Sequence, residues 1–293
     1  MIAAVFTQCI ENGKFNDEAL KLCKQNSSDN VQVVLIDNGS PEPINSNYAD
    51  ITIRTGMNMG GNCIPHYFAN LPIAQGGSLS ATKLMHELYD VICFFHADLM
   101  IVEKHWDMRL FNLFKEDKSI ALAGFVGSTE MDSLGGRGLG TMSNFQGLNY
   151  SIGKGASWRD TGALEAGVAT VACLDHCAMC YRSSYINNYD WFYLDPPPMD
   201  FEDKYISCET IAAGLKVGYV GIACDHVSGA KGQCGPSFRS VCSEWLDRHG
   251  IVVESDPTYQ VYLESESMFL KKWRDEEELI PFSVNKKGIN YVA

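Results

Sequence analysis

The segment VICFFHADLM (residues 91–100) decides the fold that the sequence predicts. It opens with five apolar residues, as expected of a strand that is buried on both faces, and two polar residues, His96 and Asp98, follow at its carboxyl end. Open α/β sheets bind their ligands outside the carboxyl ends of parallel strands. We therefore expect a buried strand here whose end carries chemistry.

The segments on either side alternate between strand and helix patterns. Before the central segment, the sequence predicts a helix over 16–25, capped by Asn16, and strands over 2–6, 31–36 and 49–55. Further strands are expected over 119–127, 168–174, 178–186 and 216–224, and further helices over about 62–70, 79–89, 105–117, 201–215 (closed by Gly214), 240–250 and 267–279. Such alternation favours an α/β fold with a mostly parallel sheet flanked by helices.

Composition narrows the class of protein. With 293 residues, 46% of them hydrophobic and 20% charged, the chain is expected to form one large or two small soluble domains. No apolar run is long enough to predict a transmembrane segment, and the N-terminal residues lack the basic region of a signal peptide, so we expect a cytoplasmic protein. Eleven cysteines, an odd number, indicate reduced thiols. The net charge of -13 argues against unspecific adhesion to nucleic acid or anionic membranes.

Polar residues follow three of the expected strands. They are the turn from Asp37 to Ser40, the pair His96 and Asp98, and the pair Asp225 and His226. Each pattern alone is common in turns and strand caps. Because the carboxyl ends of parallel strands share one edge of a sheet, we expect the three groups to converge on one cleft.

Five segments in order along residues 2–229 resemble the inverting GT-A glycosyltransferases of family 2. The matching segments are VVLIDNGSPEP (33–43), NMGGN (58–62), CFFHADLMI (93–101), ACLDHCAMCYRSSYI (172–186) and FEDKYISCETIAAGLKVGYVGIACDHVSG (201–229). The third segment occupies the position of the family's Asp-x-Asp motif, with His96 in place of the first Asp. The last segment is the most specific match, because it combines an acid pair that opens a helix with a strand and a His-x-Ser-Gly ending.

The resemblance implies a GT-A fold, a Rossmann-like mixed and mostly parallel sheet flanked by helices, with a mainly helical C-terminal tail. Residues 1–127 are then expected to form the half that binds the nucleotide-sugar donor. Residues 128–235 are expected to form a flexible loop, glycine-rich up to about residue 161, and the acceptor-binding and catalytic half. Residues 236–293 are expected to form a helical extension.

The resemblance also implies an activity. It predicts a metal-dependent hexosyl- or pentosyltransferase that moves a sugar, with inversion, from a nucleotide diphosphate donor to an acceptor hydroxyl. A UDP-sugar is the commonest donor in the family. On the donor side the resemblance assigns Asp37 to the uracil or ribose. The other donor-binding candidates are Thr7, Asn38, Asn58, Gly60, Asn62, His96, Ala97 and Arg137.

The expected cofactor is Mn²⁺ or Mg²⁺. A divalent cation stabilises the charge that builds on the departing diphosphate, and hard cations prefer carboxylate oxygens, with imidazole accepted by Mn²⁺. Asp98 matches the metal-binding acid of the motif, and His226 and His96 complete the candidate ligand set.

A carboxylate is also expected to take the proton of the acceptor hydroxyl. Asp203 is the first candidate for this general base and Glu202 the second, because adjacent side chains at a helix start point apart. A purely structural role is the alternative, since acids are common in the first turn of a helix. The acceptor-binding candidates are Asp175, Trp191 and Asp195. The acceptor itself stays open among a glycan, a lipid-linked sugar, a protein and a hydroxylated DNA base.

Three other classes of protein compete with this interpretation. Cys173, Cys177 and Cys180 have a spacing that is also found in iron-sulfur enzymes, although buried cysteines are common. Nucleotidyl transfer uses a similar fold, but the N-terminal segment offers only Lys14 beside one glycine to bind a triphosphate. A non-catalytic binding protein with the same fold is the third alternative.

Overall fold

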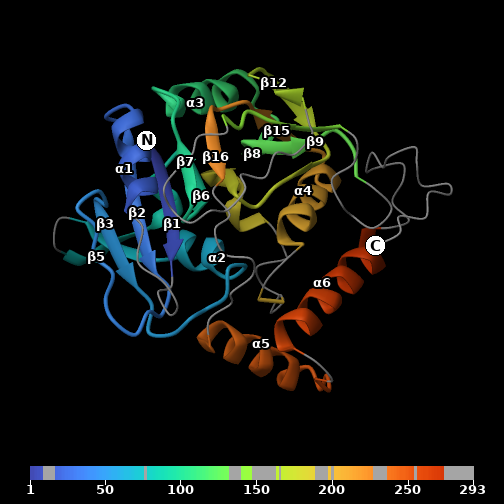
Figure 1. The fold of residues 1–293 in the computed structure, drawn as a ribbon. Coiled ribbons are helices and arrows are strands. Elements are labelled where there is room, and N and C mark those ends of the chain that lie inside the picture. Colours follow the sequence, from blue (N-terminus) through green and yellow to red (C-terminus); the bar gives the residue numbers. More distant parts are fainter. Residues whose placement is uncertain are drawn as a thin grey trace.

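The structure is a computed structural model. It describes residues 1–8, 17–75, 78–131, 140–146, 163–164, 166–188, 197–198, 201–226, 236–253 and 256–273. Its centre is an eight-stranded sheet in the order β12-β15-β8-β14-β6-β1-β2-β3 (Figure 1). These strands are β1 (Ile2–Gln8), β2 (Val31–Asp37), β3 (Ile51–Arg54), β6 (Val91–His96), β8 (Ile120–Gly124), β12 (Val168–Val171), β14 (Ala178–Arg182) and β15 (Lys216–Val220).

The sheet is mixed and mostly parallel, as the sequence predicts. Four neighbouring pairs are parallel, namely β1–β2, β1–β6, β2–β3 and β8–β15, and three are antiparallel, namely β6–β14, β8–β14 and β12–β15. Strand β14 therefore enters between the parallel strands β6 and β8 and runs against both. The sheet is continuous across residue 127, the expected boundary between the donor and acceptor halves.

Helices cover both faces of this sheet. Helices α1 (Glu18–Asn26) and α3 (Trp106–Glu116) pack on the face formed by residues such as Phe6, Leu35 and Phe95. Helices α2 (Ile64–Ala69) and α4 (Glu202–Ala212) pack on the face formed by residues such as Val5 and Phe94. The near-continuous apolar runs of β1, β2 and β6 are explained by this double burial.

Shorter strands complete the described part of the fold. A second sheet has the order β11-β10-β9-β13, and two ribbons pair β16 with β7 and β4 with β5. Their bounds are β4 (Pro72–Gln75), β5 (Ser78–Leu84), β7 (Leu99–Ile101), β9 (Val126–Ser128), β10 (Thr141–Ser143), β11 (Ala163–Leu164), β13 (Cys173–Leu174) and β16 (Cys224–His226). The ribbon of β16 and β7 matters for the site, because it pairs His226 with Leu99, directly after Asp98.

The C-terminal tail is helical, as expected. Helix α5 (Pro236–Arg248) and helix α6 (Pro257–Trp273) extend from one side of the sheet, and α6 leads back to α4 (Figure 1). Phe269 and Trp273 of α6 join the core on the α4 face, and Lys272 donates to Tyr205 and Glu209 of α4. No helix among the residues listed above as described has the length and apolar character to cross a membrane.

The predicted helix over 79–89 is wrong. Residues Ser78–Leu84 instead pair as β5 with β4, and only a short 3-10 turn, η1 (Met85–Glu87), follows. The sequence between the two strands contains Gly76 and Gly77, and a Gly-Gly pair is a common hairpin signal. The expected strands over 119–127, 168–174 and 216–224 each divide into two, and the expected strand over 178–186 ends at Arg182, where a 3-10 helix, η2 (Ser183–Asn188), begins. The N-cap of α1 is Asp17 rather than Asn16, and α6 begins at Pro257 rather than at residue 267.

Candidate functional site

A cavity of about 270 Å³ lies at the carboxyl ends of β1 and β6. Its walls are formed by Thr7, Gly61, Ile64, Pro65, Phe94, Phe95, His96, Ala97, Asp98 and His176. Thr7 and His96 are register partners at the ends of adjacent parallel strands. Both continue the alternation of the residues that face α2 and α4, such as Val5 and Phe94, so their side chains lie on that face of the sheet. The sequence predicted three of these wall positions on the donor side, namely Thr7, His96 and Ala97.

Three side chains with metal-ligating atoms meet beside this cavity. The Nδ1 atom of His96 lies 3.0 Å from the Nε2 atom of His226, and Oδ1 of Asp98 lies 3.2 Å from the same Nε2. All three candidate ligand atoms lie within 4.8 Å of one another. The structure therefore brings together the metal ligands that the sequence predicts, from the end of β6, the turn after it and β16.

Two of the three separations between these atoms fit a divalent transition metal. Bonds of about 2.1 Å at tetrahedral or octahedral angles separate neighbouring ligand atoms by roughly 3.0–3.4 Å. The separations of 3.0 and 3.2 Å lie in that range. Two imidazoles and one carboxylate are a donor set that Mn²⁺ and Zn²⁺ accept more readily than Mg²⁺ does, because Mg²⁺ prefers oxygen ligands.

Electrostatics keep His96 and Asp98 in the forms that bind metal, whereas a metal at His226 would have to displace the proton of its Nε2, which is bonded to Asp98. Burial, together with the neighbouring His176 and His226, lowers the pKa of His96 to about 3, so its ring is neutral near pH 7. Burial alone would raise the pKa of the Asp98 carboxyl, but the hydrogen bond from His226 and the nearby His226 and His96 rings outweigh it and lower the pKa. A neutral imidazole and an ionised carboxylate are the metal-binding species.

His176 is a site residue that the sequence reasoning missed. It follows Asp175 in the turn between β13 and β14, and its ring meets the ring of His96 edge-on, with centroids 4.9 Å apart. Its Nε2 atom lies 2.5 Å from Oε1 of Glu202. Burial opposes protonation of this ring, but Glu202, helped by Asp203 and Asp175, raises the pKa of His176 to about 9. The side chain therefore places a positive charge at the cavity wall near pH 7.

Both predicted general bases lie at the start of α4 and are buried. Glu202 is 2% exposed and Asp203 is 8% exposed. Asp203 uses its carboxylate on backbone groups, because Oδ2 accepts from the N–H of His176 at 3.1 Å and Oδ1 accepts from the N–H of Lys204 at 2.8 Å. Glu202 instead contacts the His176 ring, which lines the cavity. The two acids point apart, as expected, and Glu202 is the one directed at the cavity wall.

Asp37 ends β2 at the same edge of the sheet as His96 but lies on the opposite face. By alternation it lies on the face of Val33 and Leu35, which α1 and α3 cover. Its carboxylate is 1% exposed and accepts from the backbone N–H groups of Ser40 and Ile44, at 3.1 and 3.2 Å. The Nε atom of Arg54 lies 3.5 Å from the same carboxylate. These contacts shape the turn after β2, and the role of Asp37 on the nucleotide stays a prediction.

The donor-side asparagines hold this edge of the sheet together. Asn38 donates to Oδ1 of Asn58 at 3.1 Å, and Asn58 donates to Oγ of Ser237 in α5 at 3.0 Å. Asn62 donates to the carbonyl of Pro197 at 2.7 Å, while its buried Oδ1 has no partner among the described residues. The turn formed by residues 58–62 thus connects the end of β2 with α5 and with Pro197.

Glycines allow the backbone to approach closely here. Gly39 has φ +76°, and a Cβ atom on it would lie 2.2 Å from the backbone nitrogen of Asn58. Gly60 has φ +73°, and its Cβ would meet Pro198 at 2.8 Å. The glycine at position 60 of the NMGGN turn is therefore explained by packing, because no larger residue fits there.

The remaining predicted residues divide into two groups. Asp175 lies in the turn that carries His176, and one of its oxygens, the Cys177 sulfur and a His226 nitrogen lie within 4.8 Å of one another. Arg137, Trp191 and Asp195 lie outside the described residues.

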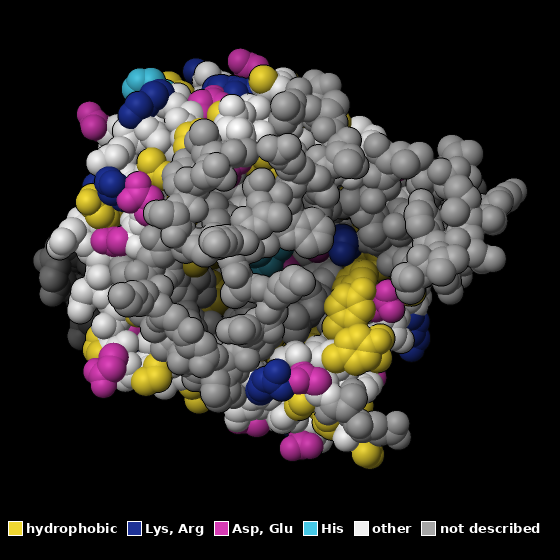
Figure 2. Space-filling model, in the orientation of Figure 1, with side chains coloured by type: hydrophobic (Ala, Val, Ile, Leu, Met, Phe, Trp, Pro, Cys, Tyr) yellow, Lys and Arg dark blue, Asp and Glu magenta, His cyan; other side chains and the backbone are white. Residues whose placement is uncertain are grey.

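Exposed aromatic side chains stand beside the start of α4. Tyr262 of α6 packs on Phe201, with ring centroids 5.6 Å apart, and Tyr259 stacks on Tyr262 at 6.4 Å with an interplanar angle of 8°. Tyr259 is 57% exposed and Tyr262 is 36% exposed. Figure 2 shows exposed hydrophobic side chains on this face, with acidic and basic side chains interspersed among its described residues.

The cysteine spacing does not form an iron-sulfur site. Cys173 packs in the core on the α4 face of the sheet, whereas Cys177 and Cys180 pack in the core on the α3 face. All three are buried. Cys173 belongs to a different core cluster from the other two thiols, and these three do not appear together as a metal-ligating group among the described residues. They act as small core residues.

Comparisons with known proteins support the fold. No protein family and no curated protein matches the chain by sequence. The crystal structure of GalNAc-T7 with UDP, GalNAc and Mn²⁺ matches at a TM-score of 0.50 and 12% identity, over 96% of this chain and 55% of that chain. This chain thus spans about half the length of GalNAc-T7.

Two further solved structures match at lower TM-scores. TarS of S. aureus, residues 1–349, matches at 0.40 and 12% identity, over 94% of this chain and 73% of that chain. The mannosyltransferase PcManGT from Pyrobaculum calidifontis, in complex with GDP-Man and Mn²⁺, matches at 0.42 and 10% identity, over 93% of this chain and 70% of that chain. The sheet order, the site at the end of β6 and the match to GalNAc-T7 together show that the chain has the fold of the GT-A glycosyltransferases.

Proposed function

We propose that this protein is a metal-dependent glycosyltransferase that moves a sugar from a nucleotide diphosphate donor to an acceptor hydroxyl. The observation that carries the proposal is the cluster of His96, Asp98 and His226 at the carboxyl end of β6, next to a cavity on a GT-A-like fold. A GT-A fold alone does not determine the reaction, so the proposal rests on this cluster and on the acids Glu202 and Asp203 at the start of α4.

The metal would be held by His96 Nδ1, His226 Nε2 and the Asp98 carboxylate. When bound, a divalent cation there supplies positive charge for the diphosphate that leaves the donor. Mn²⁺ is the preferred candidate because two of the three ligands are imidazoles. GalNAc-T7 was crystallised with UDP and Mn²⁺, which makes a UDP-sugar with Mn²⁺ the first combination to test.

His176 would support the same reaction from its position beside His96. Its ring carries a positive charge near pH 7, because Glu202 raises its pKa to about 9. A preorganised cation beside the departing diphosphate stabilises charge that develops during transfer. Thr7 and Gly61 line the same cavity.

The proton of the acceptor hydroxyl would go to a carboxylate at the start of α4. Of the two candidates, Glu202 is tested first, because Asp203 already accepts from two backbone N–H groups, and Glu202 would have to leave its contact with His176 to receive the proton. Inversion of configuration at the transferred sugar follows if this carboxylate activates the hydroxyl for direct attack, as in the family that the sequence resembles. Tyr259 and Tyr262 offer aromatic faces to a sugar acceptor beside this acid pair.

Thermal unfolding with nucleotides tests the proposal. UDP, GDP and dTDP are added in turn, each with Mn²⁺ and again with excess chelator. A ligand at about 100 times its Kd stabilises the fold by about 2.7 kcal/mol. We expect one nucleotide to raise Tm only with metal, and Asp98→Ala to abolish the shift. Asp29→Ala is the control, because Asp29 is an exposed acid remote from the cluster.

The outcome also separates the competing classes of protein. If no nucleotide raises Tm with or without Mn²⁺, the transferase proposal fails and a non-catalytic binding role replaces it. If a nucleoside triphosphate with a sugar phosphate is consumed and pyrophosphate is released, the reaction is nucleotidyl transfer instead. NMR of the anomeric proton in the product checks inversion.

A further inference from the structure

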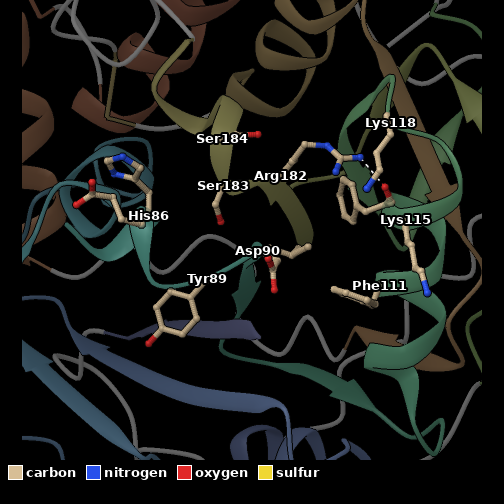
Figure 3. A pocket seen from close by; sticks show the side chains of 12 residues that line it. His86, Tyr89, Asp90, Phe111, Lys115, Lys118, Arg182, Ser183 and Ser184 are labelled. Carbon is tan, nitrogen blue, oxygen red and sulfur yellow. Dashed lines mark hydrogen bonds between the residues drawn. The ribbon is translucent and has the colours of Figure 1, made fainter. Parts of the chain in front are cut away.

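A second cavity, of about 420 Å³, lies at the opposite edge of the central sheet (Figure 3). It opens where β6 begins and β14 ends, and these ends are paired through Val91 and Arg182. The first cavity lies at the other end of β6, at His96, about 17 Å away for five strand residues of about 3.3 Å each. The second cavity is therefore separate from the candidate transfer site.

One side of the second cavity carries a fixed guanidinium. Arg182 donates through Nε to the carbonyl of Ile120 at 3.0 Å and through Nη2 to the carbonyls of Phe114 and Asp117 at 2.7 and 3.1 Å. The guanidinium also stacks on the Phe114 ring, 5.2 Å from its centroid. Its Nη1 atom has no hydrogen bond among the described residues. A guanidinium that is already immobilised loses little entropy when it binds an anion with its remaining donors.

Two lysines add positive charge to the same side. Lys115 and Lys118 line the cavity and form no ion pair among the residues that the structure describes. Asp117, which lies between them in the sequence, does not neutralise them, because its carboxylate is bound to Lys216 at 2.8 Å. Figure 3 shows Arg182, Lys115 and Lys118 on one side of the cavity. Cations gathered in a concave site attract an anionic group.

A buried hydroxyl without a partner faces the same cavity. Ser183 lines the cavity and is 3% exposed, and its Oγ atom makes no hydrogen bond among the described residues. Leaving a buried hydroxyl unpaired costs about 1–3 kcal/mol, so a ligand oxygen at this point would gain by satisfying it. In Figure 3, Ser183 and Asp90 lie between the cationic side and the side formed by His86 and Tyr89.

An acidic side chain, Asp90, also lines the cavity. Its Oδ2 contacts the Met1 nitrogen at 2.5 Å, and its Oδ1 makes no hydrogen bond among the described residues. A carboxylate commonly accepts from the hydroxyl groups of a sugar. Glu87, whose carboxylate accepts from the N–H of Leu84, also lines the cavity, and its negative charge disfavours a ligand with several phosphates, because like charges repel at short range.

We propose that this cavity binds a small sugar or polyol that carries one phosphate group. The phosphate would contact Arg182 Nη1, Lys118 and Lys115, and the hydroxyl groups would contact Asp90 and Ser183, over the apolar surface of Phe111. Arg and Lys are the usual phosphate-binding side chains. A volume of 420 Å³ lies within the range of ligand pockets in proteins, roughly 300–1,000 Å³.

Calorimetric titration of the full chain tests this site. The probes are glucose 6-phosphate, mannose 6-phosphate and glycerol 3-phosphate, with glucose and inorganic phosphate as the two partial ligands. We expect at least one phosphorylated probe to bind with a Kd below about 1 mM and about tenfold more tightly than either partial ligand. No binding by any of the three phosphorylated probes up to about 5 mM overturns the proposal, and equal affinity for inorganic phosphate does so too.

Variants locate the ligand. Lys118→Ala should weaken binding about tenfold, because a charge-assisted contact is lost. Ser183→Ala should weaken binding as well but leave Tm of the free protein unchanged or raised, since it removes an unpaired buried hydroxyl. Lys271→Ala, on α6 and away from the cavity, is the matched control. Arg182 is not substituted, because its hydrogen bonds to the carbonyls of Phe114 and Asp117 hold the end of α3 and their loss would destabilise the fold.

The result is independent of the proposed transferase reaction. Asp98→Ala should leave affinity for the sugar phosphate unchanged, since the two cavities lie at opposite ends of β6. If Asp98→Ala or saturation with a nucleotide and Mn²⁺ abolishes binding, the ligand occupies the first cavity and the proposal is overturned. Unchanged affinity in both Lys118→Ala and Ser183→Ala overturns it in the same way.

Discussion

Glu202 and His176 form a buried contact of 2.5 Å between the first residue of α4 and the turn that follows β13. Glu202 has no other partner among the described residues, and its carboxylate is 2% exposed. A buried charge that loses its partner is strongly destabilising, and the Glu202 charge raises the pKa of His176. Through His176, which lines the cavity, the acid of α4 is connected to the rings of the proposed metal cluster.

Glu202→Gln should lower the rate of sugar transfer by about 10²- to 10⁴-fold, the usual contribution of a general base. Binding of the nucleotide with Mn²⁺ should weaken but persist, because His96, Asp98 and His226 are unchanged whereas His176 loses the charge that raises its pKa. Glu209→Gln on the same helix is the control, since Glu209 is bound to Lys272 of α6 and does not line the cavity. If Asp203→Asn is inactive while Glu202→Gln keeps nearly full activity, Asp203 is the base instead.

In chelator-treated protein, His176 should titrate near pH 9, well above an ordinary histidine. A histidine whose pKa is raised on folding contributes stability below its unfolded pKa of about 6.5, and this contribution is lost as pH rises through 9. NMR of the imidazole protons measures the pKa directly. Glu202→Gln should move it downward, because the Glu202 charge is the largest of the effects that raise it. An unchanged pKa in that variant would contradict the ion pair.

His226→Ala should weaken Mn²⁺ binding by more than about tenfold. Even the loss of a residue that only hydrogen-bonds to a metal ligand typically lowers metal affinity by roughly 10–100-fold. Electron paramagnetic resonance of free Mn²⁺ gives the Kd of each variant. His249→Ala is a suitable control, since His249 lies in the C-terminal region and bonds to the carbonyl of Trp245. Equal affinity in wild type and His226→Ala would remove His226 from the ligand set.

Gly39→Ala should destabilise the fold by about 2 kcal/mol or more, because a left-handed backbone conformation alone costs an alanine about 1–2 kcal/mol. The added Cβ would also lie 2.2 Å from the backbone nitrogen of Asn58. Gly56→Ala is the matched control, since nothing lies within 4 Å of its Cβ position and its φ is not positive. Urea unfolding measures both free energies. Equal stability of the two variants would mean that the turn after β2 can rearrange.

The sequence predicted the framework of the sheet well, because strands buried on both faces leave long apolar runs. The runs in β1, β2 and β6 are of this kind, and the GT-A fold that the resemblance implied is confirmed. The β4–β5 hairpin was missed, since SATKLMHEL has enough helix-forming residues to favour a helix and local preference yields to strand pairing. Whether the chain functions in halves divided at residue 127 stays a prediction.

The candidate site was predicted in part. The sequence indicated the metal-ligand candidates His96, Asp98 and His226 because each lies at the end of a strand or just after one. Such positions lie at the same edge of a parallel sheet. The direction of Asp37 was not predicted, because a strand end fixes the edge on which a residue lies, whereas alternation fixes the face. His176 was missed, since a polar residue in a turn looks ordinary until α4 places Glu202 against it.

Strand β14 has only five residues, Ala178–Arg182, and both cavities depend on it. His176 precedes it at one end, and Arg182 and Ser183 stand at the other. Adding or deleting one residue within the strand would turn every following side chain to the opposite face and shift one end by about 3.3 Å. In homologues of this protein, insertions and deletions should therefore fall in other segments. This strand should keep its length of five residues even where its amino acids vary.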